Sequence, residues 1–79
     1  MKLVLEYDFS DFHGNYCQRV REITIARLAT PRATREQALK TIYEMLPAGV
    51  SWHMEATESG KVVLEAWGYG HGLDGYTER

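Results

Sequence analysis

Three histidines and one cysteine are the side chains of this sequence best suited to metal binding or nucleophilic chemistry. His13, His53, His71 and Cys17 fall in three separate predicted elements, which is typical of chance scatter. We therefore predict no metal site and no cofactor.

Catalytic groups are equally sparse. Cys17 would need a histidine in reach and an electropositive surrounding to act as a nucleophile, and a strand cysteine is more often a packed small side chain. Asp8 and Asp11, beside a predicted turn, could divide acid and base roles only if burial separated their pKa values. Because a turn is exposed, we predict that the protein is not an enzyme.

The charges are unevenly distributed along the chain. Residues 17–40 contain six basic and two acidic residues, whereas the remainder contains three basic and nine acidic ones, for a net charge of −2. The basic segment contains Arg19, Arg21, Arg27, Arg32 and Arg35. Guanidinium groups suit phosphates and carboxylates, although charges of this kind also protect an edge strand from aggregation. The mildly acidic pI of about 5.9 makes nucleic acid the alternative partner and not the first one.

A glycine-rich run at residues 67–76 is the second candidate surface. In an extended chain it places Trp67, Tyr69, His71 and Leu73 on one side, separated by glycines. This pattern fits a ribbon that lies on a partner or stacks on bases. It equally fits a frayed tail that folds back over the sheet, so we expect a domain at 1–67 and a tail, with flexibility as an open alternative, at 68–79.

Two strands are expected in the first third of the chain. Residues 2–9 alternate with period two, and the polar stretch 10–15 favours a turn. Residues 16–28 are compatible with strand or helix. The β-branched run Ile23, Thr24 and Ile25 favours a strand, with either a bulge or a solvent-exposed first half.

The helix is the clearest element. Thr34 as N-cap and Gln37 three residues later form a capping-box pattern, and Pro47 with Gly49 ends the helix, which predicts a helix at about 34–46. Its apolar stripe consists of Ala38, Leu39, Ile42, Met45 and Leu46. That stripe must face the core.

Period two returns after the helix. Val50, Trp52, Met54 and Ala56 predict one strand, a turn follows at 58–60, and residues 61–67 predict another strand with Val62, Leu64 and Ala66 facing inward. The expected fold is α+β in β-β-α-β-β order, with a four-stranded, mainly antiparallel sheet. One helix covers one face, so the other must meet water or a partner.

Size and composition point to a single small domain. The chain has 79 residues, of which 44% are hydrophobic and 25% charged. A core of this size leaves little stability for a deep cleft. A lone cysteine and the lack of a long apolar run predict a cytoplasmic protein that does not insert into membranes.

These features together predict a non-enzymatic binding protein, an inhibitor or adaptor that contacts a larger protein or nucleoprotein complex. The profile is similar in type, and not in sequence, to phage-borne anti-CRISPR and anti-restriction inhibitors. A nucleic-acid-binding module is the alternative. The candidate contacts are Arg19, Arg21, Arg27, Arg32, Arg35, His53, Trp67 and Tyr69. Val4, Val63 and Trp67 are expected on the uncovered sheet face among mostly acidic residues, which predicts a monomer or a weak dimer.

Overall fold

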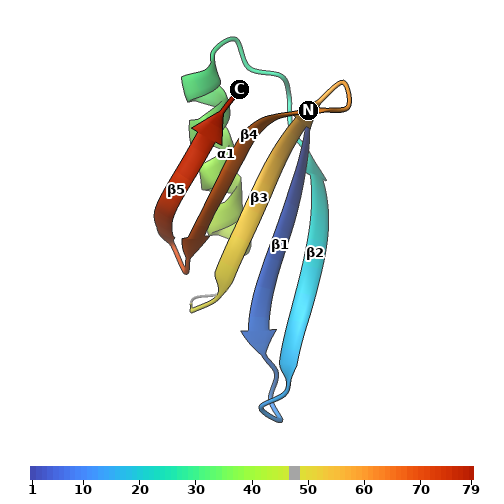
Figure 1. The fold of residues 1–79 in the computed structure, drawn as a ribbon, viewed down its shortest axis with the longest axis vertical. Coiled ribbons are helices and arrows are strands. Elements are labelled where there is room, and N and C mark those ends of the chain that lie inside the picture. Colours follow the sequence, from blue (N-terminus) through green and yellow to red (C-terminus); the bar gives the residue numbers. More distant parts are fainter. Residues whose placement is uncertain (47–48) are drawn as a thin grey trace.

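The computed structural model describes residues 1–46 and 49–79 as one helix and one five-stranded sheet (Figure 1). The elements are β1 (Lys2–Ser10), β2 (Tyr16–Thr24), α1 (Pro31–Met45), β3 (Ser51–Glu58), β4 (Lys61–Tyr69) and β5 (Gly72–Glu78). Neighbouring strands are all antiparallel, in the order β2-β1-β3-β4-β5. A small α+β domain with one helix and an antiparallel sheet is thus confirmed. The prediction of four strands is wrong, because part of the glycine-rich segment forms β5.

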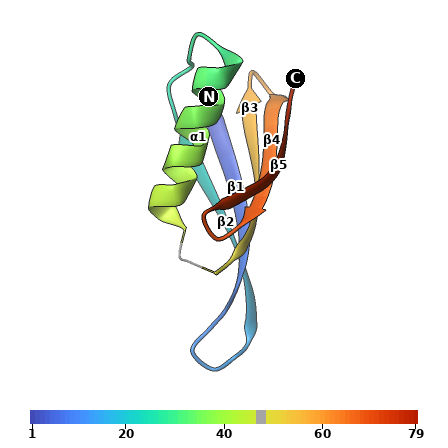
Figure 2. The same ribbon diagram turned by 90° about the vertical axis from the view of Figure 1, so that its left-hand side faces the viewer.

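The core lies between α1 and one face of the sheet, as Figure 2 shows. Alternate residues of β1, β3 and β4 supply the sheet side of this core, and Ala38 and Ile42 supply much of the helix side. The buried strand residues are Leu3, Leu5, Tyr7, Trp52, Met54, Ala56, Leu64 and Ala66. Period-two alternation therefore predicts the inward residues of β1 and β3 correctly.

The N-cap of the helix lies four residues earlier than predicted. Thr30 is the N-cap, and its hydroxyl oxygen accepts a hydrogen bond from the amide of Ala33 at 3.1 Å. Pro31 follows at the first helical position, where its fixed φ suits a helix and its missing amide hydrogen costs nothing. Thr34, the predicted cap, is instead buried inside the first turn. α1 is neither long nor apolar enough to cross a membrane, and the described residues include no other helix.

The end of the helix agrees with the sequence in part. Leu46 is the C-cap, and its amide donates to the carbonyl oxygen of Ile42 at 2.9 Å. Gly49 has a φ of +80°, a conformation that suits glycine. Pro47, predicted to stop the helix, lies outside the described residues.

β2 is a strand, and it is shorter than the predicted range of 16–28. It pairs with β1 over its whole length without a register shift, so the exposed alternative is correct and the bulge is not. Of the β2 residues, Ile23 packs against the core. The β1–β2 hairpin extends past the end of α1 (Figure 2), and the molecule measures 44 Å along its longest axis.

A bulge in β4 changes which valine packs inward. Thr57 pairs with Val62 and Ala56 with Leu64, so Val63 is the extra residue. Val63 packs against the core, and Val62 does not belong to that set. The prediction that Val62 faces the core and Val63 the uncovered face is therefore wrong.

β5 packs beside β4 through glycines of the 67–76 segment, for which flexibility was one of two expected alternatives. A side chain at Gly68 would start 2.7 Å from Cζ2 of the Trp52 indole and 2.0 Å from the carbonyl oxygen of Gly72. The Trp52 indole N–H donates to the carbonyl oxygen of Gly70 at 3.0 Å. The glycines thus let β4 and β5 approach a large buried ring.

Candidate functional site

The sheet face that α1 leaves uncovered, here called the open face, contains three central rows of residues that cross the strands. The register aligns residues of β2, β1, β3, β4 and β5, in that order, in each row. The rows are Glu22, Val4, Glu55, Glu65 and Thr77; Val20, Glu6, His53, Trp67 and Gly75; and Gln18, Asp8, Ser51, Tyr69 and Gly72. Figure 1 shows the five strands that position them.

Three of the exposed aromatic side chains in the described residues lie on this face. Trp67 is 40% exposed and Tyr69 is 60% exposed, next to each other in alternate positions of β4. Val20 and Tyr16 of β2 are exposed on the same face at the opposite edge. The face therefore offers apolar surface on the edge strand β2 and on β4, the strand next to the other edge.

Carboxylates occupy the middle of the open face. Five acidic side chains, Glu6, Asp8, Glu22, Glu55 and Glu65, lie in the three rows. Lys2, one row further along β1, forms an ion pair of 3.6 Å with Glu22. The face is therefore acidic, and it would attract cationic groups.

His53 lies at the centre of these carboxylates. Its Nε2 atom is 3.1 Å from Oε1 of Glu65, and Glu6 lies opposite it on β1. A possible ligand atom comes from each of His53, Glu55 and Glu65. These three atoms lie within 4.8 Å of one another. The sequence singles out His53 but misses the two glutamates. Residues two apart in a strand point to the same face, so the position of Glu55 two residues after His53 is a sequence signal that indicates Glu55.

Two of the five candidate arginines lie on the other face of the sheet. Arg19 is opposite Tyr7 and Arg21 is opposite Leu5, so both side chains share the face of the buried residues, at the exposed edge strand β2. The guanidinium carbon of Arg19 is 5.4 Å from the centre of the Phe9 ring. These arginines and the aromatic pair Trp67 and Tyr69 thus lie on opposite faces.

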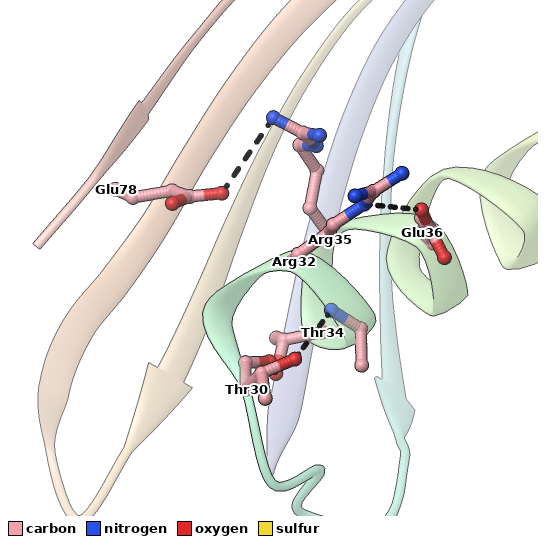
Figure 3. A network of polar contacts seen from close by, with 7 residues as sticks. Thr30, Arg32, Thr34, Arg35, Glu36 and Glu78 are labelled. Carbon is pink, nitrogen blue, oxygen red and sulfur yellow. Dashed lines mark hydrogen bonds and ion pairs between the residues drawn. The ribbon is translucent and has the colours of Figure 1, made fainter.

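The helix arginines are engaged with neighbouring side chains (Figure 3). Arg32 forms an exposed ion pair of 3.2 Å with Glu36, one turn along α1. Arg35 reaches β5, where it is 3.8 Å from a carboxylate oxygen of Glu78 and 4.4 Å from the centre of the Tyr76 ring. β5 and β2 are opposite edges of the sheet, so the structure does not join Arg35 with Arg19 and Arg21 into one strip.

Arg27 lies in the segment before α1. It lines a small hollow of about 190 Å³ whose lining also includes Glu78, the ion-pair partner of Arg35. The predicted basic strip is therefore divided between the β2 edge of the sheet and the region around the start of α1.

The remaining histidines and the cysteine are dispersed over the molecule. His71 lies near α1, with its ring centre 5.7 Å from that of Tyr43. His13 lies beside Phe12 in the β1–β2 turn, and the Cys17 thiol is 3.6 Å from the carbonyl oxygen of Asn15. Phe12 itself is 99% exposed at the tip of the hairpin, a residue that sequence reasoning did not single out.

Two side chains near this hairpin have displaced pKa values. The backbone amide of Asn15 donates to the Asp11 carboxylate and, with that of His13, holds the pKa of Asp11 below its ordinary value. Hydrogen bonding to the Asp8 carboxylate raises the pKa of Tyr16. Both groups lie at the protein surface, so these shifts reflect local turn and strand geometry.

Comparison with known protein families, curated proteins and solved structures finds no match. The assignment of a site therefore rests on geometry alone, and the open face is the candidate surface.

Proposed function

We propose that this chain is a non-enzymatic binding protein that contacts a larger protein through its open face, as an inhibitor or adaptor. One observation supports this most directly. Among residues 1–46 and 49–79, six large hydrophobic residues are exposed, and four of them lie on this one face: Tyr16, Val20, Trp67 and Tyr69. Exposed aromatic groups that gather on one surface are typical of protein interfaces.

The charges on the open face specify the chemistry of the partner. Carboxylates lie between the exposed apolar side chains of β2 and those of β4, with His53 among them. An interface pairs potentials of opposite sign, which speeds encounter and excludes wrong partners. The partner surface is therefore basic, with apolar pockets for Trp67 and Tyr69.

A nucleic-acid ligand remains the alternative proposal, and the geometry favours it less. Stacking on Trp67 and Tyr69 would bring phosphates to a face on which the nearby charges are carboxylates. Arg19 and Arg21, which would hold those phosphates, lie on the opposite face. A strand of nucleic acid would need to wrap around the edge strand β2 to use both groups.

A charge-reversal pair tests the open face. Glu6→Lys with Asp8→Lys changes this face, and Glu36→Lys with Glu44→Lys makes the same change in charge on exposed positions of α1. In affinity capture from a lysate of the source cells, followed by reconstitution with the purified partner, the first variant should lose at least tenfold in affinity. The helix variant should bind like the wild type.

Two results would contradict the proposal. If both variants bound the purified partner equally well, the open face would not be the interface. If labelled oligonucleotides bound at micromolar affinity, with a steep loss of affinity as salt is raised, the nucleic-acid alternative would replace it. Circular dichroism of both variants shows that each is folded before the comparison is made.

A further inference from the structure

Three side chains with metal-binding atoms converge at the centre of the open face. The Nε2 or Nδ1 atom of His53 and one carboxylate oxygen each of Glu55 and Glu65 lie within 4.8 Å of one another. All three residues are half-buried, so their freedom to turn away is reduced. Within this group, His53 Nε2 and Glu65 Oε1 are 3.1 Å apart.

The backbone fixes this arrangement. His53 and Glu55 are two residues apart in β3 and so point to the same face. Glu65 is directly opposite Glu55 in β4, and the two strands are joined by a tight turn in which Ser59 and Gly60 have positive φ angles. The three positions thus belong to a single hairpin, one of the more rigid supports that a small fold can offer.

The arrangement places like charges against each other. Directly opposed glutamates in an antiparallel pair are destabilising. Glu65 is paired with His53, and among residues 1–46 and 49–79 neither Glu55 nor Glu65 forms an ion pair with a lysine or arginine. A bound cation would neutralise both carboxylates at once.

We propose that His53, Glu55 and Glu65 bind a divalent transition-metal ion of the Zn²⁺ class, with water completing the coordination. Carboxylates alone would favour Mg²⁺ or Ca²⁺, and the imidazole shifts the preference toward Zn²⁺. Ligand atoms at roughly 2.0–2.2 Å from Zn²⁺ in tetrahedral geometry are roughly 3.3–3.6 Å from each other. The three donor atoms lie within 4.8 Å of one another, so side-chain rotations would have to bring them closer together to reach this spacing.

This site goes beyond the proposed function because it needs no partner protein. Trp67 is directly opposite His53 in β4, so it lies on the same face of the sheet as the site. Its fluorescence provides a local optical signal.

Isothermal calorimetry with ZnCl₂ alone, in a non-coordinating buffer at pH 7.5, tests the site. The wild type should bind one Zn²⁺ per chain with a dissociation constant below about 100 μM. His53→Gln, Glu55→Gln and Glu65→Gln should each weaken binding roughly tenfold or more. Excess Mg²⁺ should not displace the ion.

Two matched controls distinguish binding by the three proposed ligands from a general attraction of Zn²⁺ to the acidic face. Glu6→Gln removes a carboxylate from the same row as His53 without removing a member of the group, and His71→Gln removes a histidine elsewhere. Both should stay within threefold of the wild type. Zn²⁺ should change the tryptophan emission, and Trp67→Phe should abolish that change while calorimetric binding persists.

The proposal fails if the wild type shows no binding at millimolar Zn²⁺. It also fails if Glu6→Gln weakens binding as much as Glu55→Gln does, since the attraction would then be diffuse. The proposal fails as well if His53→Gln binds Zn²⁺ with the affinity of the wild type. Far-ultraviolet circular dichroism of every variant ensures that a loss of binding does not reflect a loss of fold.

Discussion

The indole of Trp67 lies against the backbone of Gly75, in the space where a side chain at that position would begin. A Cβ atom at Gly75 would be 2.5 Å from Cζ2 of the indole. The two residues face each other across β4 and β5. Glycine at this position therefore leaves room for the indole of Trp67, which is part of the open face.

Gly75→Ala should displace this ring. Overpacking a tight contact typically costs about 1–3 kcal/mol, and we expect a loss of that size in the free energy of unfolding. Thermal or urea denaturation measures it. Thr77→Ala, on the same strand and face, is the control and should change stability by less than about 0.5 kcal/mol. An equal effect of both substitutions would contradict the close packing of the Trp67 indole on Gly75.

The two tryptophans should differ in their tolerance of phenylalanine. Trp52→Phe leaves the buried carbonyl of Gly70 without its donor, which should cost about 1–3 kcal/mol in addition to lost packing. Trp67→Phe should cost less, because Trp67 is partly exposed and no hydrogen bond of its indole is found in the described part of the chain. Urea denaturation of both variants compares them. A larger loss in Trp67→Phe would overturn this ranking.

The position of the helix cap can be tested directly. Thr30→Ala removes the hydroxyl that accepts from the Ala33 amide and should destabilise the protein by about 1 kcal/mol. Thr41→Ala is a matched change in the middle of α1, where the Thr41 hydroxyl donates to a helix carbonyl, and it should be nearly neutral. Denaturation midpoints provide the comparison, and equal effects would argue against Thr30 as the cap.

Asp11 should make stability depend on pH in the acid range. Its pKa in the folded state lies below the ordinary value of 3.8, so its contribution is complete above that value and is lost as the pH falls through the folded-state pKa. The difference in melting temperature between the wild type and Asp11→Asn should therefore be largest near neutral pH and shrink below about pH 4. A difference that stays constant down to pH 2 would contradict this assignment.

Self-association is expected to be weak. Two copies joined face to face would bring the carboxylates of Glu6, Glu55 and Glu65 together across a two-fold axis. We expect a monomer, or a dimer no tighter than micromolar, at moderate salt. Light scattering over a dilution series measures the mass, and a mass of twice 9.1 kDa that persists at nanomolar concentration would refute the prediction.

The sequence predicted elements whose signals are local. Alternation in β1 and β3 identified the buried residues, since a half-buried strand has only two faces. The helix start was misplaced because Thr30 and Thr34 both resemble caps, and the adjacent Pro31 favours the first of them. β5 was missed because glycines disfavour strands locally, whereas contacts with Trp52 and Trp67 hold it in place.

The candidate site was only partly visible for a related reason. Counting back from the turn without a bulge would place Glu55 opposite Leu64. The register shift beside Thr57 moves Glu55 opposite Glu65 and leaves Val63 as the extra residue. A bulge is set by tertiary packing more than by local residue preference, so the meeting of His53, Glu55 and Glu65 could not be read from the sequence.

The central place of β1 has a consequence for the order of folding. β1 is first in the chain, yet it pairs with β3 across the helix and its connections. The β1–β2 hairpin and the β3–β4–β5 meander each close through short turns, so each can form early, whereas joining them requires closure of a long loop. We expect this docking to limit the folding rate. In stopped-flow experiments, substitutions between β1 and β3 should slow refolding, and those at the outer edge of β5 should mainly speed unfolding.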